Sequence, residues 1–394
     1  MRIPQTRIKK SELKAFLLLF PFVEVHIFNV GPLYDVAIFA AILYVVVLFL
    51  KGRLKLKTEC IPLLLYAMWL TLSCYLNNRS IIPGLFYGLK LFAFTQIVEY
   101  YLQRKDITFL LVIRKYVSFC MIITTLFQYI NQDFFGHLEV SGNYNNFAFG
   151  DNILGYYYIP FIAVCIVLDR MNNVKISRYT WVMIITALLS LVRAWSAKSI
   201  VGIALIVLYV MFVYGNRLSK LFNPIFVIGT YVLAEIGLVF FNIQEKFSYI
   251  IENILHKDAT LTGRTGLWFN AINNIRNSPV YGYGVTNGGG IYLNTTFVGS
   301  TTHSSHNLIL EMLMQTGFVG LALWSMYIIL SLLRNKKNIN ADSDTYYMLV
   351  FFVFVILIMQ LTSGSLYIAF YYLPVILCAN NYVLFSEQWR NKRE

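Results

Sequence analysis

The chain has 394 residues, of which 58% are hydrophobic and only 13% are charged, and its mean hydropathy is +0.62. A soluble domain of this length needs more polar surface, so this composition excludes an ordinary soluble protein. The net charge of +13 suggests nucleic acid binding at first, but the positions of the charges indicate membrane topology instead. Because the apolar runs are continuous rather than alternating, the sequence predicts an all-α polytopic membrane protein and not a barrel.

The apolar runs predict about twelve transmembrane helices. They are expected near 13–30, 33–50, 61–76, 81–103, 108–130, 152–169, 179–195, 199–215, 224–242, 306–330, 346–362 and 366–385. If the N-terminus is cytoplasmic, most Lys and Arg residues fall in cytoplasmic segments, as the positive-inside rule requires. Both termini are therefore predicted to be cytoplasmic. The predicted organisation is a transmembrane bundle over 1–241, one large outer-side loop over 242–305 between spans nine and ten, and C-terminal transmembrane helices over 306–394.

Ionisable residues at membrane depth are functional candidates, because placing them there is costly. The candidates are Glu24, His26, Asp35, Lys90, Glu99, Arg114, Arg193, Lys198 and Glu235. The stretch LVRAWSAKSIVGIAL places Arg193 and Lys198 in an outer-side turn, where the positive-inside rule makes cations unexpected. The turn is interpreted either as an anion site or as ordinary interfacial anchoring.

The large outer loop contains one segment with a helical pattern. Leu267, Ala271 and Ile275 recur at helical spacing, and Asn277-Ser278-Pro279 ends the pattern. Gly282 and Gly284 then permit a tight turn. A loop of this length is typical of a functional segment rather than a simple connection.

The segment HSSH places His303 and His306 at the entry to the tenth span. A zinc site is not indicated, because no third ligand follows at a suitable spacing. Ser304 or Ser305 is expected to cap a helix that begins at His306. The dipole of this helix would disfavour the protonated form of the His306 imidazole, and a neutral imidazole can serve as a general base. The alternative is that the histidine only caps the helix or anchors it at the interface.

These segments together resemble the superfamily of O-antigen ligases and of O-antigen and capsular polysaccharide polymerases. The matching residues are Gly263, Arg264, Trp268, Gly282, Gly284, His306, Asn307, Leu310, Gly317 and Gly320. The segment SAKSIVGIAL is similar to the Ser-x-Arg/Lys stretch of the family, with Lys198 at the basic position. The serine that more often precedes this basic residue is replaced by Ala197. Whether Arg193 or Lys198 carries the role therefore stays open.

The resemblance implies a GT-C-like, membrane-embedded glycosyltransferase that uses an undecaprenyl-diphosphate-linked glycan as donor. Arg264, with Arg193 or Lys198, would bind the diphosphate, and His306 would take the proton of the acceptor hydroxyl in an inverting displacement. Gly263, Trp268, Gly282, Gly284 and Asn307 would support the site. Tyr281, Tyr283 and Trp268 could line the glycan path. No metal or other cofactor is required. A flippase and a chain-length regulator are expected partners, besides membrane lipids, and nucleic acid is not.

Two activities follow from the resemblance. A polymerase would join lipid-linked repeat units into O-antigen or capsular polysaccharide at the outer face of the bacterial inner or cytoplasmic membrane. A ligase would transfer the finished glycan to another acceptor, such as the lipopolysaccharide core. The degenerate basic motif favours the polymerase. A secondary transporter is disfavoured because the sequence lacks matching half-repeats, and a non-catalytic scaffold would leave the outer-side cations unexplained.

Overall fold

A computed structural model describes residues 10–23, 25, 31–130, 152–241, 243, 246, 249, 264–286, 295–297, 300–302, 304–334, 342–364 and 366–386. Most of these residues are helical, and among them one short antiparallel strand pair, β1 with β2, departs from the all-α prediction. The helices are α1 (Lys10–Leu19), α2 (Gly31–Leu50), α3 (Ile61–Leu76), α4 (Ile81–Gln103), α5 (Thr108–Ile130), α7 (Leu154–Met171), α8 (Arg178–Arg193), α9 (Ala197–Phe212), α10 (Pro224–Phe241), α12 (Arg264–Asn277), α13 (Leu308–Leu333), α14 (Ser343–Gln360), α15 (Leu373–Ala379) and α16 (Asn381–Leu384). The strands are β1 (Thr295–Phe297) and β2 (Ser300–Thr302), and the 3-10 turns are η1 (Phe20–Phe22), η3 (Thr58–Cys60), η4 (Arg217–Leu221) and η7 (Ala369–Tyr372).

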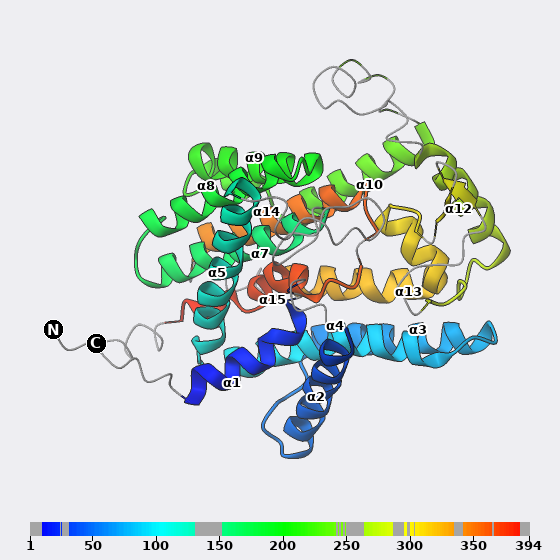
Figure 1. Ribbon diagram of the computed structural model, residues 1–394, viewed down its shortest axis with the longest axis horizontal. Helices are drawn as coiled ribbons and strands as arrows, with labels where there is room; N and C mark the ends of the chain where they lie inside the picture. Colours follow the sequence, from blue (N-terminus) through cyan, green and yellow to red (C-terminus); the bar gives the residue numbers. More distant parts are fainter. Residues whose placement is uncertain are drawn as a thin grey trace.

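Eight of the described helices are long and apolar enough to cross a membrane. They are α2, α3, α4, α5, α7, α10, α13 and α14, and α9 and α15 are shorter apolar helices. The polytopic all-α prediction is therefore confirmed, whereas the number of twelve spans stays a prediction. Most long helices lie roughly side by side in one bundle, with α12 at one end of it beside α13 (Figure 1).

Two predicted spans differ from the described helices. The segment predicted at 366–385 is not one helix but the series η7, α15 and α16. Pro374 lies in the first turn of α15, where its missing N–H costs no hydrogen bond, so a new helix starts there instead of an old one continuing. In the described part of the segment predicted at 13–30, α1 ends at Leu19 and the 3-10 turn η1, which contains Pro21, follows.

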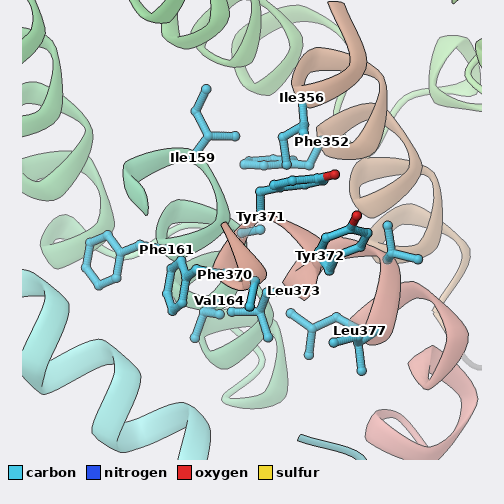
Figure 2. Close-up of a cluster of buried hydrophobic side chains, with 14 of the residues drawn as sticks. Ile159, Phe161, Val164, Phe352, Ile356, Phe370, Tyr371, Tyr372, Leu373 and Leu377 are labelled. Carbon is cyan, nitrogen blue, oxygen red and sulfur yellow. The ribbon is translucent and has the colours of Figure 1, made fainter. Parts of the chain in front are cut away.

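The core of the bundle forms around α7, in which every residue from Leu154 to Asp169 is buried. Figure 2 shows side chains of η7 and α15 packed between α7 and α14 in this core. The labelled residues are Ile159, Phe161, Val164, Phe352, Ile356, Phe370, Tyr371, Tyr372, Leu373 and Leu377. Helix α9 packs closely on the same helix, because a Cβ at Gly202 would lie 2.9 Å from Ile159 Cδ1. This packing fixes the start of α9 relative to the start of α7.

Helix α13 is broken about a third of the way along its length. Gly317 has φ 61° and ψ −166°, a backbone conformation that residues other than glycine rarely adopt. The carbonyls of Met314, Gln315 and Thr316 therefore need hydrogen-bond donors from outside the helix. In a membrane such a break is tolerated only where protein satisfies the released backbone groups.

The segment 279–285 and helix α3 satisfy these backbone groups. Tyr283 N donates to Met314 O at 2.7 Å and Gly284 N to Gln315 O at 2.9 Å. From α3, Trp69 Nε1 donates to Thr316 O at 2.8 Å and Ser73 Oγ to Gln315 O at 2.7 Å. The glycine turn that the sequence predicted thus becomes an inserted segment that completes the broken helix.

The turn itself requires glycine at two positions. Gly282 and Gly284 have φ values of 65° and 76°, in the left-handed region. A Cβ at Gly282 would lie 2.6 Å from the carbonyl carbon of Gln315. Glycine is needed there for both its backbone conformation and its lack of a side chain.

Three cations near the end of α4, the end of α13 and the start of α14 are paired with carboxylates. Lys57 Nζ lies 2.5 Å from Glu99 Oε2, and Arg170 Nε lies 3.2 Å from Asp342 Oδ2. Arg334, which follows α13, pairs with Glu59. In these three pairs, each buried carboxylate has a cationic partner.

Candidate functional site

Three predicted site residues come together although they are far apart in the sequence. Lys198 lies in the first turn of α9, Arg264 is the first residue of α12, and His306 lies two residues before α13. Burial, then the positive charges of Arg264 and Lys198, lower the pKa of the His306 imidazole to about 4. The histidine is therefore uncharged at neutral pH. It lies next to the Arg264 cation and to Lys198, whose pKa is lowered to about 7 by burial and then by the charge of Arg264.

Lys198 is held by groups from two other helical regions. Its Nζ donates to Ser363 Oγ at 3.0 Å and lies 5.0 Å from the centroid of the Tyr156 ring at the start of α7. Within the described part of the chain, no carboxylate forms an ion pair with Lys198. Among the described residues, this half-buried ammonium is supported by a hydroxyl and a ring face rather than by a carboxylate, so it is suited to receive an anion.

Arg193 is not part of this cluster. Helix α8 ends at Arg193, Trp195 has a positive φ of 49°, and α9 begins at Ala197, so the two cations are not on one continuous helix. The Arg193 side chain is exposed, and its Nε donates to Gln128 O of α5 at 3.1 Å. Of the two basic residues that the sequence left open, the structure brings Lys198 to Arg264 and His306 and places Arg193 elsewhere.

Arg264 is positioned by the apolar face of α12. Leu267, Ala271 and Ile275 are buried and pack against α13, which confirms the helix predicted from their spacing. Burial lowers the pKa of the Arg264 guanidinium, and Tyr156 opposes this shift. Arginine stays charged over the working range of proteins, so the group is a fixed cation. Gly263, the preceding residue of the predicted motif, lies outside the described residues.

His306 precedes the helix instead of beginning it, which corrects the expected cap. The residue has a positive φ of 51°, and its backbone N donates to Ser304 Oγ at 3.1 Å. Asn307 is the N-cap of α13, because its Oδ1 accepts from Leu310 N at 2.9 Å. Ser304 and Ser305 do not cap this helix because their side chains bond elsewhere.

Glu311 holds these two serines and was not predicted from the sequence. Its Oε2 accepts from Ser304 Oγ at 3.0 Å, from Ser305 N at 2.9 Å and from Ser305 Oγ at 3.0 Å. Its Oε1 accepts from Gln315 Nε2 at 3.1 Å. A fully buried carboxylate in an apolar run was the signal available, since such a residue needs donors. Glu311 thereby fixes the turn that presents His306.

Trp268 connects this turn to α12. The indole is buried, and its Nε1 donates to Ser305 O at 3.1 Å. Arg264 and His306 are thus carried by two elements that are hydrogen-bonded to each other. His303 lies outside the described residues, so its predicted loop position stays a prediction.

The aromatic residues expected along a glycan path have different surroundings. Tyr283 OH donates to Asn274 O at 2.8 Å, and Trp268 is occupied by its bond to Ser305. Tyr281 is 39% exposed. Of these three, Tyr281 has the most open side chain for contact with a ligand.

The fold and the site together define a polytopic membrane protein in which Lys198 and Arg264 lie beside an uncharged histidine, and no described carboxylate forms an ion pair with either. Residues 179–325, which include Lys198, Arg264 and His306, match the family model described as O-antigen ligase. Over this stretch, which is less than half of the chain, the sequence is similar to the O-antigen ligase and polymerase superfamily, whose members are glycosyltransferase-like enzymes that act on lipid-linked glycans in membranes. No curated protein matches the chain.

Proposed function

We propose that the protein is a polysaccharide polymerase, an inverting glycosyltransferase that joins undecaprenyl-diphosphate-linked repeat units. The observation that supports this most directly is the grouping of Lys198, Arg264 and His306. The site is proposed to face the outer side of the bacterial cytoplasmic membrane, with both chain termini in the cytoplasm. This orientation follows from the distribution of Lys and Arg along the chain.

Lys198 and Arg264 are proposed to bind the diphosphate of the donor. A diphosphate is strongly anionic, and guanidinium contacts to its oxygens are charge-assisted and often bidentate. No described carboxylate forms an ion pair with either cation, so the ligand would provide the missing charge. The same cations would stabilise the charge that develops on the leaving diphosphate.

His306 is proposed to be the general base. The acceptor sugar hydroxyl attacks the anomeric carbon, a new carbon–oxygen bond forms, and the bond from that carbon to the diphosphate oxygen breaks with its electron pair leaving on the diphosphate. His306 takes the hydroxyl proton, and one direct displacement inverts the anomeric configuration. The pKa of about 4 in the free protein makes a weak base. Bound diphosphate would offset the charges of Arg264 and Lys198 and raise this pKa, so base strength would rise once the donor is in place.

A ligase that transfers finished glycan to another acceptor is the second candidate. The description of the matching family as O-antigen ligase favours it. Donor chemistry is shared by the two activities, and only the acceptor differs. The Ser-x-Arg/Lys stretch, in which Ala197 replaces the more usual serine, favours the polymerase, because polymerase sequences vary more.

Deletion of the gene distinguishes these activities. A polymerase is expected to leave surface polysaccharide with single repeat units and no ladder on a gel. Accumulation of long lipid-linked chains would instead indicate a ligase. An unchanged ladder together with unchanged lipid-linked intermediates would exclude both.

A further inference from the structure

Glu235 is a buried carboxylate that the proposed reaction has not yet used. It is the one charged residue of α10, whose sequence is PIFVIGTYVLAEIGLVFF, and its side chain is 8% exposed. Within the described part of the chain, neither of its carboxylate oxygens accepts a hydrogen bond of normal length, although the Asn307 side chain interacts with it. An ionised or protonated carboxyl in this position is costly unless something donates to it.

The surroundings of Glu235 connect it to the candidate site. Asn307 is the residue directly after His306, and α10 packs against α13. Tyr231, one helical turn before Glu235, interacts electrostatically both with Glu235 and with Tyr156, the residue whose ring lies beside Lys198. Glu235 therefore belongs to the polar lining around His306 and Lys198 rather than to an unrelated part of the bundle.

Two structural roles for Glu235 are already filled by other groups. A carboxylate near a helix N-terminus can satisfy its free N–H groups. At α13, however, Asn307 Oδ1 accepts from Leu310 N at 2.9 Å. Pairing with a cation is the usual role of a buried carboxylate, but no ion pair of Glu235 forms among the described residues.

We propose that Glu235 is a sugar-binding residue, whose carboxylate accepts a hydrogen bond from a hydroxyl or amide N–H of the glycan at the reaction centre. This inference rests on the proposed function, since it adds recognition of the sugar to recognition of the diphosphate. Sugars present donors that a carboxylate binds strongly, because a hydrogen bond to a charged acceptor is stronger than a neutral one. A site built to bind such a donor also rejects glycans that lack it.

The proposal predicts opposite effects of one substitution on stability and on binding. In Glu235→Leu, a buried carboxyl without a donor is replaced by an apolar side chain of similar size, so the protein without substrate should unfold at the same or a higher temperature. Binding of the glycan-bearing lipid should weaken about ten- to a hundredfold, because the hydrogen bond from the sugar is lost. Glu235→Gln should show a smaller loss, since its carbonyl oxygen still accepts.

The matched control is Glu99→Gln. Glu99 is also buried, at 1% exposed, but it is paired with Lys57 and accepts from Asn380 Nδ2 at 2.7 Å. This variant should unfold at a lower temperature because it leaves Lys57 without its counter-charge. Its affinity for either lipid should match that of the wild type.

Thermal unfolding of the purified full chain in nanodiscs tests the proposal with two probes. One is undecaprenyl diphosphate without sugar, and the other is the lipid-linked repeat unit extracted from a host strain that lacks this gene. The Glu235→Leu variant should keep the stabilisation by undecaprenyl diphosphate and lose most of the additional stabilisation by the glycan-bearing lipid. Equal affinity of wild type and variant for the glycan-bearing lipid, or a lowered unfolding temperature of the variant without ligand, would overturn the inference. Failure of the wild type to be stabilised by undecaprenyl diphosphate would instead contradict the proposed function.

Discussion

The cations at the two ends of the helical bundle differ in whether a carboxylate pairs with them. At one end, Lys57 pairs with Glu99, Arg334 with Glu59 and Arg170 with Asp342. At the other end, Lys198 and Arg264 lie close to each other and to His306, and no described carboxylate pairs with either. Since a buried unpaired cation destabilises a fold, the second arrangement indicates a place where an external anion completes the structure.

The largest effect is expected where the proton acceptor is removed. His306→Ala should lower glycan transfer about a thousandfold while the protein still inserts, because general-base catalysis contributes on the order of 10²–10⁴. The measurement is transfer by purified protein, with polysaccharide ladders from cells as a second readout. His303→Ala is the control and should be mild. Normal chain length in the His306 variant would disprove the role of general base.

Removing the guanidinium tests whether the unpaired cations bind the diphosphate. Arg264→Ala should reduce transfer about 10²- to 10³-fold, as the loss of one electrostatic stabiliser of a transition state does. Arg264→Lys should recover only part of this, because an ammonium cannot reproduce the planar fork of donors. Binding of undecaprenyl diphosphate, measured by thermal shift, should weaken in the same order. Wild-type activity in the Lys variant would argue against a bidentate contact.

The pH dependence of Lys198→Met tests the electrostatic coupling within the cluster. In the wild type the pKa of His306 is about 4, so the acid limb of kcat/KM that belongs to this residue should lie near pH 4. Removing the Lys198 charge should move this limb upward, toward the ordinary value of about 6.5, with a smaller loss of rate than Arg264→Ala causes. An unshifted limb would show that Lys198 does not act on His306. Arg193→Ala, outside the cluster, should leave the limb in place.

The His306 pKa also has a consequence for stability. Because the folded value lies below the unfolded value of about 6.5, the unfolded chain binds this proton first as the pH falls. The contribution of His306 to stability is therefore present above about pH 6.5 and is lost as the pH falls toward 4. Thermal unfolding of His306→Ala should be less sensitive to pH over this window than that of the wild type.

The smallest effect on transfer is expected at the end of the bundle where each cation is paired with a carboxylate. Glu59→Ala leaves Arg334 without its counter-charge, so the free energy of unfolding should fall by about 3 kcal/mol, less where water reaches the guanidinium. The chemistry of the distant site should be unchanged per folded molecule. Glycan transfer per folded molecule measures the activity, and unfolding by urea or heat measures the stability. A loss of specific activity equal to that of Lys198→Met would remove the distinction between the two ends.

The sequence predicted what depends on local pattern. The helix from Arg264 to Asn277 and the turn at Gly282 and Gly284 follow from spacing and from glycine chemistry, and the structure confirms both. Long apolar runs likewise predicted the long helices. The grouping of Arg264, Lys198 and His306 was expected through the family resemblance, since no local pattern places residues that are 42 to 108 positions apart.

Other features depend on contacts between distant segments and could not be read from the sequence. The choice between Arg193 and Lys198 depends on the interruption of the helix at Trp195. It also depends on the hydrogen bond that Arg193 donates to Gln128 of α5. The role of Glu311 depends on its donors Ser304 and Ser305, which the sequence pattern instead predicted as helix caps. Because both serine hydroxyls bond to Glu311, Asn307 caps the helix instead.

The break in α13 constrains the order in which the chain can assemble. The carbonyls released at Gly317 have no partners in lipid, and their partners come from Trp69 and Ser73 of α3 and from the backbone of Tyr283 and Gly284. All of these residues are synthesised before α13. We therefore expect α13 to dock on α3 and on residues 283–284 as it enters the membrane, because these partners are already present. Changes at Trp69 or Ser73 should consequently appear first as failed insertion of α13 and degradation of the chain, before any defect in transfer can be measured.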